Sequence, residues 1–119
     1  MPRESLDDDR IRLVHMLESA QRAIRIAGTM SQEALAHDEV RLLAVVKSIE
    51  VISEASTKVS QSTRTLHAAI DWQGIRGMRN RLIDGYDSID EKIVYRTLTN
   101  RLPPLIADLE RALATWPGA

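Results

Sequence analysis

The sequence predicts an all-α protein, a four- to five-helix up-and-down bundle, and three observations favour this fold class. Apolar residues recur at helical spacing, and no segment shows the alternation of a strand. The chain has two Trp, two Tyr and no Phe, so its core must come from aliphatic residues, which suits helix packing better than sheet packing. The chain has 119 residues, and residues 1–119 are expected to form one domain with a single core.

The composition excludes several classes of function. With 44% hydrophobic and 28% charged residues, the chain is of the folded rather than the disordered kind. Its formal net charge of −1 creates no global positive field, so any binding of nucleic acid must come from a local patch. The chain contains no cysteine, which rules out disulfides, thiolate metal sites and cysteine nucleophiles.

The sequence also predicts a cytoplasmic protein without a membrane span. Its apolar runs are short and interrupted by charges, whereas a transmembrane helix needs about 20 apolar residues. The first ten residues, MPRESLDDDR, are polar and acidic, the opposite of a signal peptide.

Two long helices are expected in the first half of the chain. The first runs from about Leu6 or Asp7 to Ala27 and ends at Gly28, with acidic residues at the positive end of its dipole. Its apolar stripe comprises Leu6, Leu13, Leu17, Ala20, Ile24 and Ala27, and its arginines Arg10, Arg12, Arg22 and Arg25 are expected to face solvent. A short helical turn capped by Thr29 or Ser31 follows. The second long helix runs from about Asp38 to Ala55, with Leu42, Val45, Val46, Ile49 and Ile52 inward.

The second half is predicted to hold a long loop and three further helices. Residues 56–69 are rich in Ser, Thr and Gln and are expected to form a loop or a frayed helix end. The third helix is expected from Trp72 to about Ile83, between an Asp71 N-cap and Gly85. A fourth is expected over about residues 89–100, capped by Ser88 or Asp87, with Ile93, Val94 and Leu98 inward. Pro103 and Pro104 mark either a kink or the first turn of a final helix over residues 104–116, with Leu105, Leu109, Ala112 and Trp116 inward.

Residues 72–86, WQGIRGMRNRLIDGY, are the stretch in which chemistry is expected. Arg76, Arg79 and Arg81 lie within six residues of each other in a chain without overall positive charge, and guanidinium groups bind phosphate bidentately. Arg79 and Tyr86 would share a face of an unbroken helix, and a break at Gly85 would swing Asp84 and Tyr86 towards Arg79. The simpler alternative is a surface pair of Arg79 with Asp84, worth about 0–1 kcal/mol.

The same stretch closely resembles the HepT-like branch of the HEPN superfamily. The resemblance rests on WxxIxGMRNRLIxGY, on the Leu-Pro-Pro-Leu that follows, and on Ile52-Ser53-Glu54-Ala55, which is similar to the Ile-Gly-Glu-Ala of the family. The family signature is an arginine, four residues, a histidine, one residue and a tyrosine. Arg79 and Tyr86 match it, Asn80 matches the polar residue after the arginine, and Asp84 stands at the histidine position.

The resemblance implies a homodimeric toxin with a metal-independent endoribonuclease site, without a cofactor, where two protomers face each other. It places Arg79 at the scissile phosphate and makes Asn80, Asp84 and Tyr86 further parts of the site. Because Arg76 and Arg81 lie close to Arg79 in the sequence, they are expected to bind RNA. The motif histidine would act as general acid or base. Aspartate has a reference pKa of about 3.9, so it is ionised at pH 7, repels phosphate and tends to pair with Arg79. We therefore expect a weakened or inactive nuclease, whether Asp84 is a natural degeneration or an engineered change.

The resemblance also implies a protein partner. Similar toxins are encoded beside a minimal nucleotidyltransferase antitoxin that adenylylates the motif tyrosine, which here is Tyr86. The added nucleotide would carry negative charge into the arginines and block RNA.

The sequence bears on three other interpretations. His15, His37 and His67 are scattered and lack the paired Glu-x-x-His motifs of a di-iron bundle, so no metal site is expected. A second hypothesis is a non-catalytic helical binding or regulatory module that partners a nucleotidyltransferase. A third is a helical dimer without a nucleotide-related role, which a buried Arg79, or one paired away from any cleft, would favour.

Overall fold

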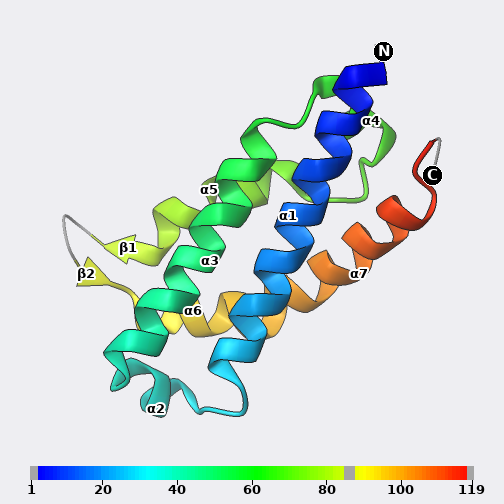
Figure 1. Ribbon diagram of the computed structural model, residues 1–119. Coiled ribbons are helices and arrows are strands. Elements are labelled where there is room, and N and C mark those ends of the chain that lie inside the picture. Colours follow the sequence, from blue (N-terminus) through cyan, green and yellow to red (C-terminus); the bar gives the residue numbers. More distant parts are fainter. Residues whose placement is uncertain (1–2, 85–87, 118–119) are drawn as a thin grey trace.

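Two long antiparallel helices, α1 (Arg3–Ala27) and α3 (Glu39–Thr57), lie side by side in the computed structural model (Figure 1). α5 (Trp72–Leu82) packs against α3, and α7 (Leu102–Ala114) packs against α1. The other elements are short: α2 (Gln32–Ala36), α4 (Gln61–Leu66), β1 (Ile83–Asp84), β2 (Ser88–Ile89), α6 (Glu91–Arg96) and the π-helical turn η1 (Thr97–Arg101). The structure describes the backbone of residues 3–84 and 88–117, and the side chains of residues 6–83 and 88–117. The predicted all-α bundle is confirmed.

Local sequence signals set most of the helix starts. The side chains of Ser31, Asp38 and Asp71 accept hydrogen bonds from backbone N–H groups three residues on, at 3.1, 3.1 and 3.0 Å, which satisfies donors that the first turn leaves free. Gly28, with φ of 56°, ends α1 in the left-handed conformation that glycine adopts without strain.

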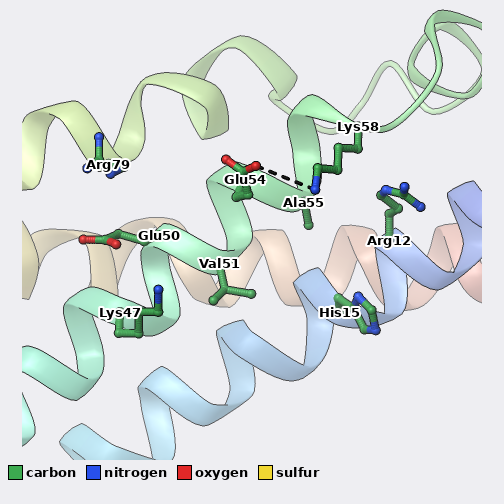
Figure 2. Close-up of a pocket in the computed structure, with 9 residues that line it drawn as sticks. All are labelled: Arg12, His15, Lys47, Glu50, Val51, Glu54, Ala55, Lys58 and Arg79. Atoms are coloured by element: carbon green, nitrogen blue, oxygen red, sulfur yellow. Dashed lines mark ion pairs between the residues drawn. The ribbon is translucent and has the colours of Figure 1, made fainter.

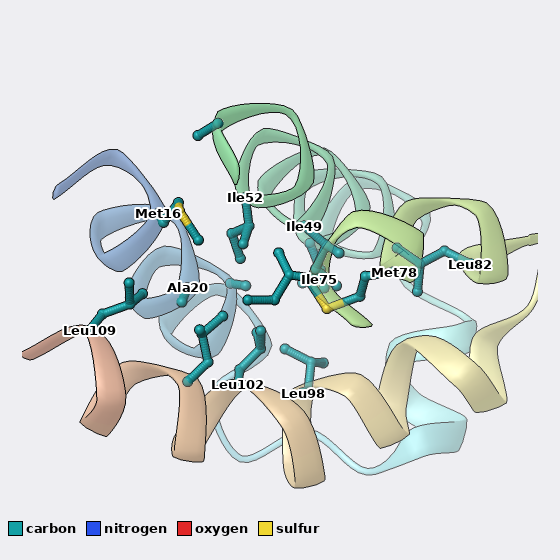
Figure 3. Close-up of a cluster of buried hydrophobic side chains, with 14 of the residues drawn as sticks. Met16, Ala20, Ile49, Ile52, Ile75, Met78, Leu82, Leu98, Leu102 and Leu109 are labelled. Carbon is teal, nitrogen blue, oxygen red and sulfur yellow. The ribbon is translucent and has the colours of Figure 1, made fainter. Parts of the chain in front are cut away.

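One aliphatic core joins the helices, as Figure 3 shows. The predicted stripes of α3 and α7 are buried throughout. In α1, Leu13, Ala20 and Ala27 are buried, whereas Leu6, Leu17 and Ile24 are only partly buried. Met16 and Ala23, which the predicted stripe left out, are fully buried instead, because α3 and α7 together cover a wider face of α1 than a single stripe.

The predicted loop over residues 56–69 is wrong in part, because it contains the helix α4. Ser60 caps this helix, and the buried carboxylate of Asp9 on α1 accepts hydrogen bonds from the Ser60 backbone N–H at 3.1 Å and from the Ser60 and Thr63 hydroxyls at 2.6 Å each. A six-residue helix is too short to be stable by itself. A contact with a residue about 50 positions earlier stabilises it, and no local pattern reveals such a contact.

The region after α5 also departs from the prediction. α5 ends at Leu82, and Ile83 and Asp84 pair antiparallel with Ile89 and Ser88, so the expectation of no strand is wrong for these four residues. The next helix begins at Glu91 with Asp90 as its N-cap, not Ser88. Asp90 accepts from the N–H groups of Lys92 and Ile93 at 3.1 and 3.2 Å. Asp87 and Gly85, the other predicted cap and the predicted helix end, lie outside the described residues.

Pro103 and Pro104 lie in the first turn of α7, where proline needs no hydrogen-bond donor. The preceding turn is π-helical, and the Leu102 N–H donates to the Thr97 carbonyl five residues earlier. α6, η1 and α7 therefore follow one another directly. The wider turn lets the chain pass into two consecutive prolines without ending the helix.

Candidate functional site

The helix α5 is held so that its arginines face outwards. Its buried face consists of Gly74, Ile75, Met78 and Leu82, which pack into the core (Figure 3). Asp71 caps its first turn and also pairs with Arg101 of η1 at 3.2 Å. With the rotation of the helix set in this way, Arg76, Arg79, Asn80 and Arg81 are all exposed.

The structure does not gather the three arginines at one point. Successive residues turn by about 100°, so Arg79 and Arg81 point about 160° apart around α5. The Arg81 guanidinium lies over Gly77, with Nη2 3.6 Å from the position that a β-carbon there would take. Arg76 faces a hollow beside α4, and Arg79 faces a different groove.

Arg79 borders a groove of about 570 Å³ formed by α1, α3 and α5. Figure 2 shows Arg79 projecting from α5 at one end and the α1 residues at the other, with α3 between them. Its lining consists of Arg12, His15, Lys47, Glu50, Val51, Glu54, Ala55, Lys58 and Arg79. The groove thus holds four permanent cations and two carboxylates.

Most of these cations have no acidic partner among the described residues. Lys58 pairs with Glu54, with Nζ 3.7 Å from Oε1, and both side chains are exposed, so the pair contributes at most about 1 kcal/mol. Within residues 6–83 and 88–117, no carboxylate lies within ion-pair distance of Arg12, Lys47 or Arg79. Arg79 is exposed and borders a groove. A helical dimer without a nucleotide-related role would instead be favoured by a buried Arg79, or by one paired away from any cleft.

Asp84 lies beyond the end of the helix that carries Arg79. Its backbone pairs with Ser88 in the two-residue ribbon, so the helical spacing from Arg79 to Tyr86 does not apply. The Asp84 side chain and the whole of Gly85 and Tyr86 lie outside the described residues. The chain leaves α5 at Ile83, two residues before the predicted break at Gly85.

Sequence reasoning missed most of the groove. The sequence predicts that Arg12 faces solvent and that His15 is not a metal ligand, and it gives no separate reason to select Lys47 or Glu50. One signal was present, because Lys47, Glu50, Glu54 and Lys58 are spaced by three, four and four residues and so form one charged stripe along α3. No local pattern shows that this stripe faces Arg79.

Among the described residues, no three His, Asp or Glu side chains lie close enough together to hold a metal ion. No helix in the same ranges combines the length and apolar character needed to cross a membrane.

Comparison with known proteins identifies the family. A family model described as "Ribonuclease HepT-like" matches residues 16–112. The chain is 30% identical over 101 residues to "Putative RNase TTE0752" of Caldanaerobacter subterraneus, covering 85% of this chain and 90% of that protein. It is 30% identical over 74 residues to "Probable ribonuclease HepT" of Thermococcus cleftensis, covering 62% and 67%. It is 26% identical over 111 residues to "Putative RNase MJ0127" of Methanocaldococcus jannaschii, covering 93% and 92%. No solved structure matches. The chain belongs to the HepT-like ribonuclease family of the HEPN superfamily.

Proposed function

We propose that this chain is a cytoplasmic, metal-independent endoribonuclease toxin of the HepT type, whose activity is weakened or lost because Asp84 replaces the motif histidine. The observation that carries the proposal is the setting of Arg79. Its guanidinium is exposed at a groove with three further cations and is not paired with any described carboxylate. Such a fork binds a phosphate bidentately and stabilises the charge that develops on it.

The other motif residues act on the RNA around that phosphate. Asn80, one residue from Arg79 and also exposed, offers an amide that can donate to a phosphate or sugar oxygen. Arg76, three residues before Arg79 on α5, holds the adjoining part of the RNA, whereas Arg81, which points about 160° away from Arg79, would contact RNA only where the strand passes round the helix. A histidine at position 84 would carry a proton to or from the reacting oxygen, whereas a carboxylate there repels the phosphate and competes for Arg79.

We further propose that two copies of the chain face each other through the groove side of α3. Val40 and Leu43 are 79% and 50% exposed, and they continue the stripe of Lys47, Glu50 and Glu54 at helical spacing. Exposed apolar residues next to a charged groove support an association surface. A Leu43→Glu variant should then have half the molar mass of the wild type in light scattering.

Control of this nuclease is proposed to act on Tyr86. A cognate minimal nucleotidyltransferase would transfer AMP to the Tyr86 hydroxyl and release pyrophosphate from ATP. The phosphodiester that results is a negative charge close in sequence to Arg79 and Arg81, where it would compete with RNA.

The test is to compare RNA cleavage by the wild type and by Asp84→His, with and without EDTA. We expect the histidine form to cleave and EDTA to have no effect. An Asp8→His variant, changed at an exposed position of α1, controls for a contaminating nuclease. Cleavage by the wild type at the rate of Asp84→His would show that Asp84 is not the disabling change.

A second candidate function is a non-catalytic module that partners a nucleotidyltransferase. The presence of Asp84 at the catalytic histidine position favours it. Absence of cleavage by both forms, together with stable binding to the nucleotidyltransferase, would support this candidate over the first.

A further inference from the structure

A second hollow, of about 630 Å³, lies between α4 and the start of α5. α4 and α5 are consecutive helices, and Figure 1 shows α4 near the N-terminal end of α1, away from the β1–β2 ribbon. The residues that line the hollow include Arg64, Arg76, Trp72, Gln61 and Gln73, and none of the described residues lining it is acidic. It therefore has a higher ratio of positive to negative charge than the Arg79 groove, which contains two carboxylates.

Trp72 gives this hollow an aromatic wall held in a fixed position. Its indole N–H donates to the His67 carbonyl at 3.1 Å, and the residue is half-buried and packs against the core. An indole ring anchored by its nitrogen and partly exposed at a hollow is a suitable surface for stacking a nucleobase.

Two guanidinium groups lie beside that ring. Arg64 donates from Nη2 to Gln61 Oε1 at 3.1 Å, so its side chain is held against α4. Its Nε is buried without a hydrogen-bond partner among the described residues. Arg76 is exposed, and no carboxylate of residues 6–83 and 88–117 pairs with it. Guanidinium groups that are not neutralised by carboxylates bind phosphate.

We propose that this hollow is a second RNA subsite that holds one single-stranded nucleotide away from the cleavage point. Arg64 and Arg76 bind its phosphate, the base stacks on Trp72, and the amides of Gln61 and Gln73 donate to base or sugar. The inference rests on the proposed function, because the course of the RNA strand is set by its binding at Arg79. Arg76 and Arg79 are three residues apart on α5, a rise of about 4.5 Å, so a strand bound at Arg79 continues directly to Arg76.

The chain offers its own probe for this site, because Trp72 and Trp116 are its two tryptophans and Trp116 is only 5% exposed. The ligand is a 2′-O-methyl oligoadenylate of about eight nucleotides, which a nuclease using the 2′-hydroxyl cannot cut. Tryptophan emission of the wild-type protein should fall on titration and saturate. A Trp72→Phe variant, in which Trp116 alone emits, should show no fall.

Arg76→Gln tests the phosphate contact, with Arg64→Gln as a second variant. Each should weaken oligonucleotide binding about tenfold and make the slope of log affinity against log salt less steep, by at most about 0.7, because the two arginines share one phosphate contact on a single strand. Arg22→Gln is the matched control, since Arg22 is exposed on α1 and lines neither hollow. It should bind like the wild type.

Anisotropy of a fluorescein-labelled copy of the oligonucleotide separates the two possible failures. If the labelled strand binds but the emission of Trp72 is unchanged and Arg76→Gln behaves like Arg22→Gln, the second subsite is refuted and the proposed function stands. If the strand does not bind at all, the second subsite is refuted, and the cleavage comparison with Asp84→His decides the proposed function separately. Quenching by an acidic peptide but not by the oligonucleotide would show that the hollow binds a protein, which also overturns the subsite.

Discussion

Arg101 of η1 reaches across to Asp71, the N-cap of α5, with Nη2 3.2 Å from Oδ2. The other carboxylate oxygen of Asp71 accepts from the Gly74 N–H at 3.0 Å. Because Gly74 has no side chain, there is room for this pair: a β-carbon there would lie 2.1 Å from Asp71 Oδ2 and 2.6 Å from Arg101 Nη2. One ion pair thus ties the π-helical turn to the helix that carries Arg79.

Gly74→Ala is expected to destabilise the protein by about 1 kcal/mol, because the new methyl group must displace the cap or the ion pair. Gly77→Ala on the same helix is the control. Its β-carbon would meet only Arg81, at 3.6 Å, so it should stabilise by about 0.5–1 kcal/mol through helix propensity. Urea unfolding measures both changes. An equal gain at the two positions would contradict the role given to Gly74.

Asp9→Ala is expected to lower the free energy of unfolding by about 2–4 kcal/mol, since it leaves the Ser60 and Thr63 hydroxyls without their acceptor. Asp8→Ala, at the exposed neighbouring position, should change it by less than about 0.5 kcal/mol. Thermal or urea unfolding followed by circular dichroism gives the comparison. Similar small effects at both positions would mean that α4 does not depend on α1.

Arg79→Ala should weaken the binding of single-stranded RNA about tenfold and lower any cleavage by Asp84→His by about 10²–10³-fold, because the phosphate loses its bidentate partner. Arg79→Lys should recover binding only in part, since an ammonium lacks the planar fork. Arg22→Ala, changed at an exposed arginine outside the groove, should match its parent. Gel shift and cleavage of a labelled RNA report the two effects.

Glu50→Gln should tighten RNA binding about two- to threefold, because it removes one of the two carboxylates that line the Arg79 groove. The gain should shrink as salt is raised. Glu110→Gln, on an exposed position of α7, carries the same charge change away from the groove and should have no effect. Weaker binding by Glu50→Gln would indicate that Glu50 contacts the ligand through a hydrogen bond.

Tyr86→Phe should abolish labelling by the cognate nucleotidyltransferase and ATP, because phenylalanine lacks the acceptor hydroxyl. Tyr95→Phe is the natural control, as Tyr86 and Tyr95 are the two tyrosines of the chain. Intact-mass spectrometry would detect the addition of one AMP to the wild type and to Tyr95→Phe. Undiminished labelling of Tyr86→Phe would place the modification on another residue.

The sequence by itself determined the helical class, the caps at Ser31 and Asp71, and the buried stripes of α3 and α7. These depend on periodicity and on contacts within a few residues, which a linear pattern records. It also singled out Arg79 and Asp84 as candidate site residues, because a motif is a property of residue order. The local prediction failed at α4 and at the β1–β2 ribbon, where short elements depend on contacts outside themselves.

Only the tertiary structure decided what surrounds Arg79. The rotation of α5 separates Arg79 from Arg81 and directs Arg76 to a different hollow, although the three are neighbours in sequence. Packing of α1 and α3 beside α5 brings Arg12, His15 and Lys47 to the Arg79 groove. Periodicity tells which face of a helix is polar, but which neighbour that polar face meets depends on how the buried faces pack together. The charge of a site made by three helices is therefore set by their packing.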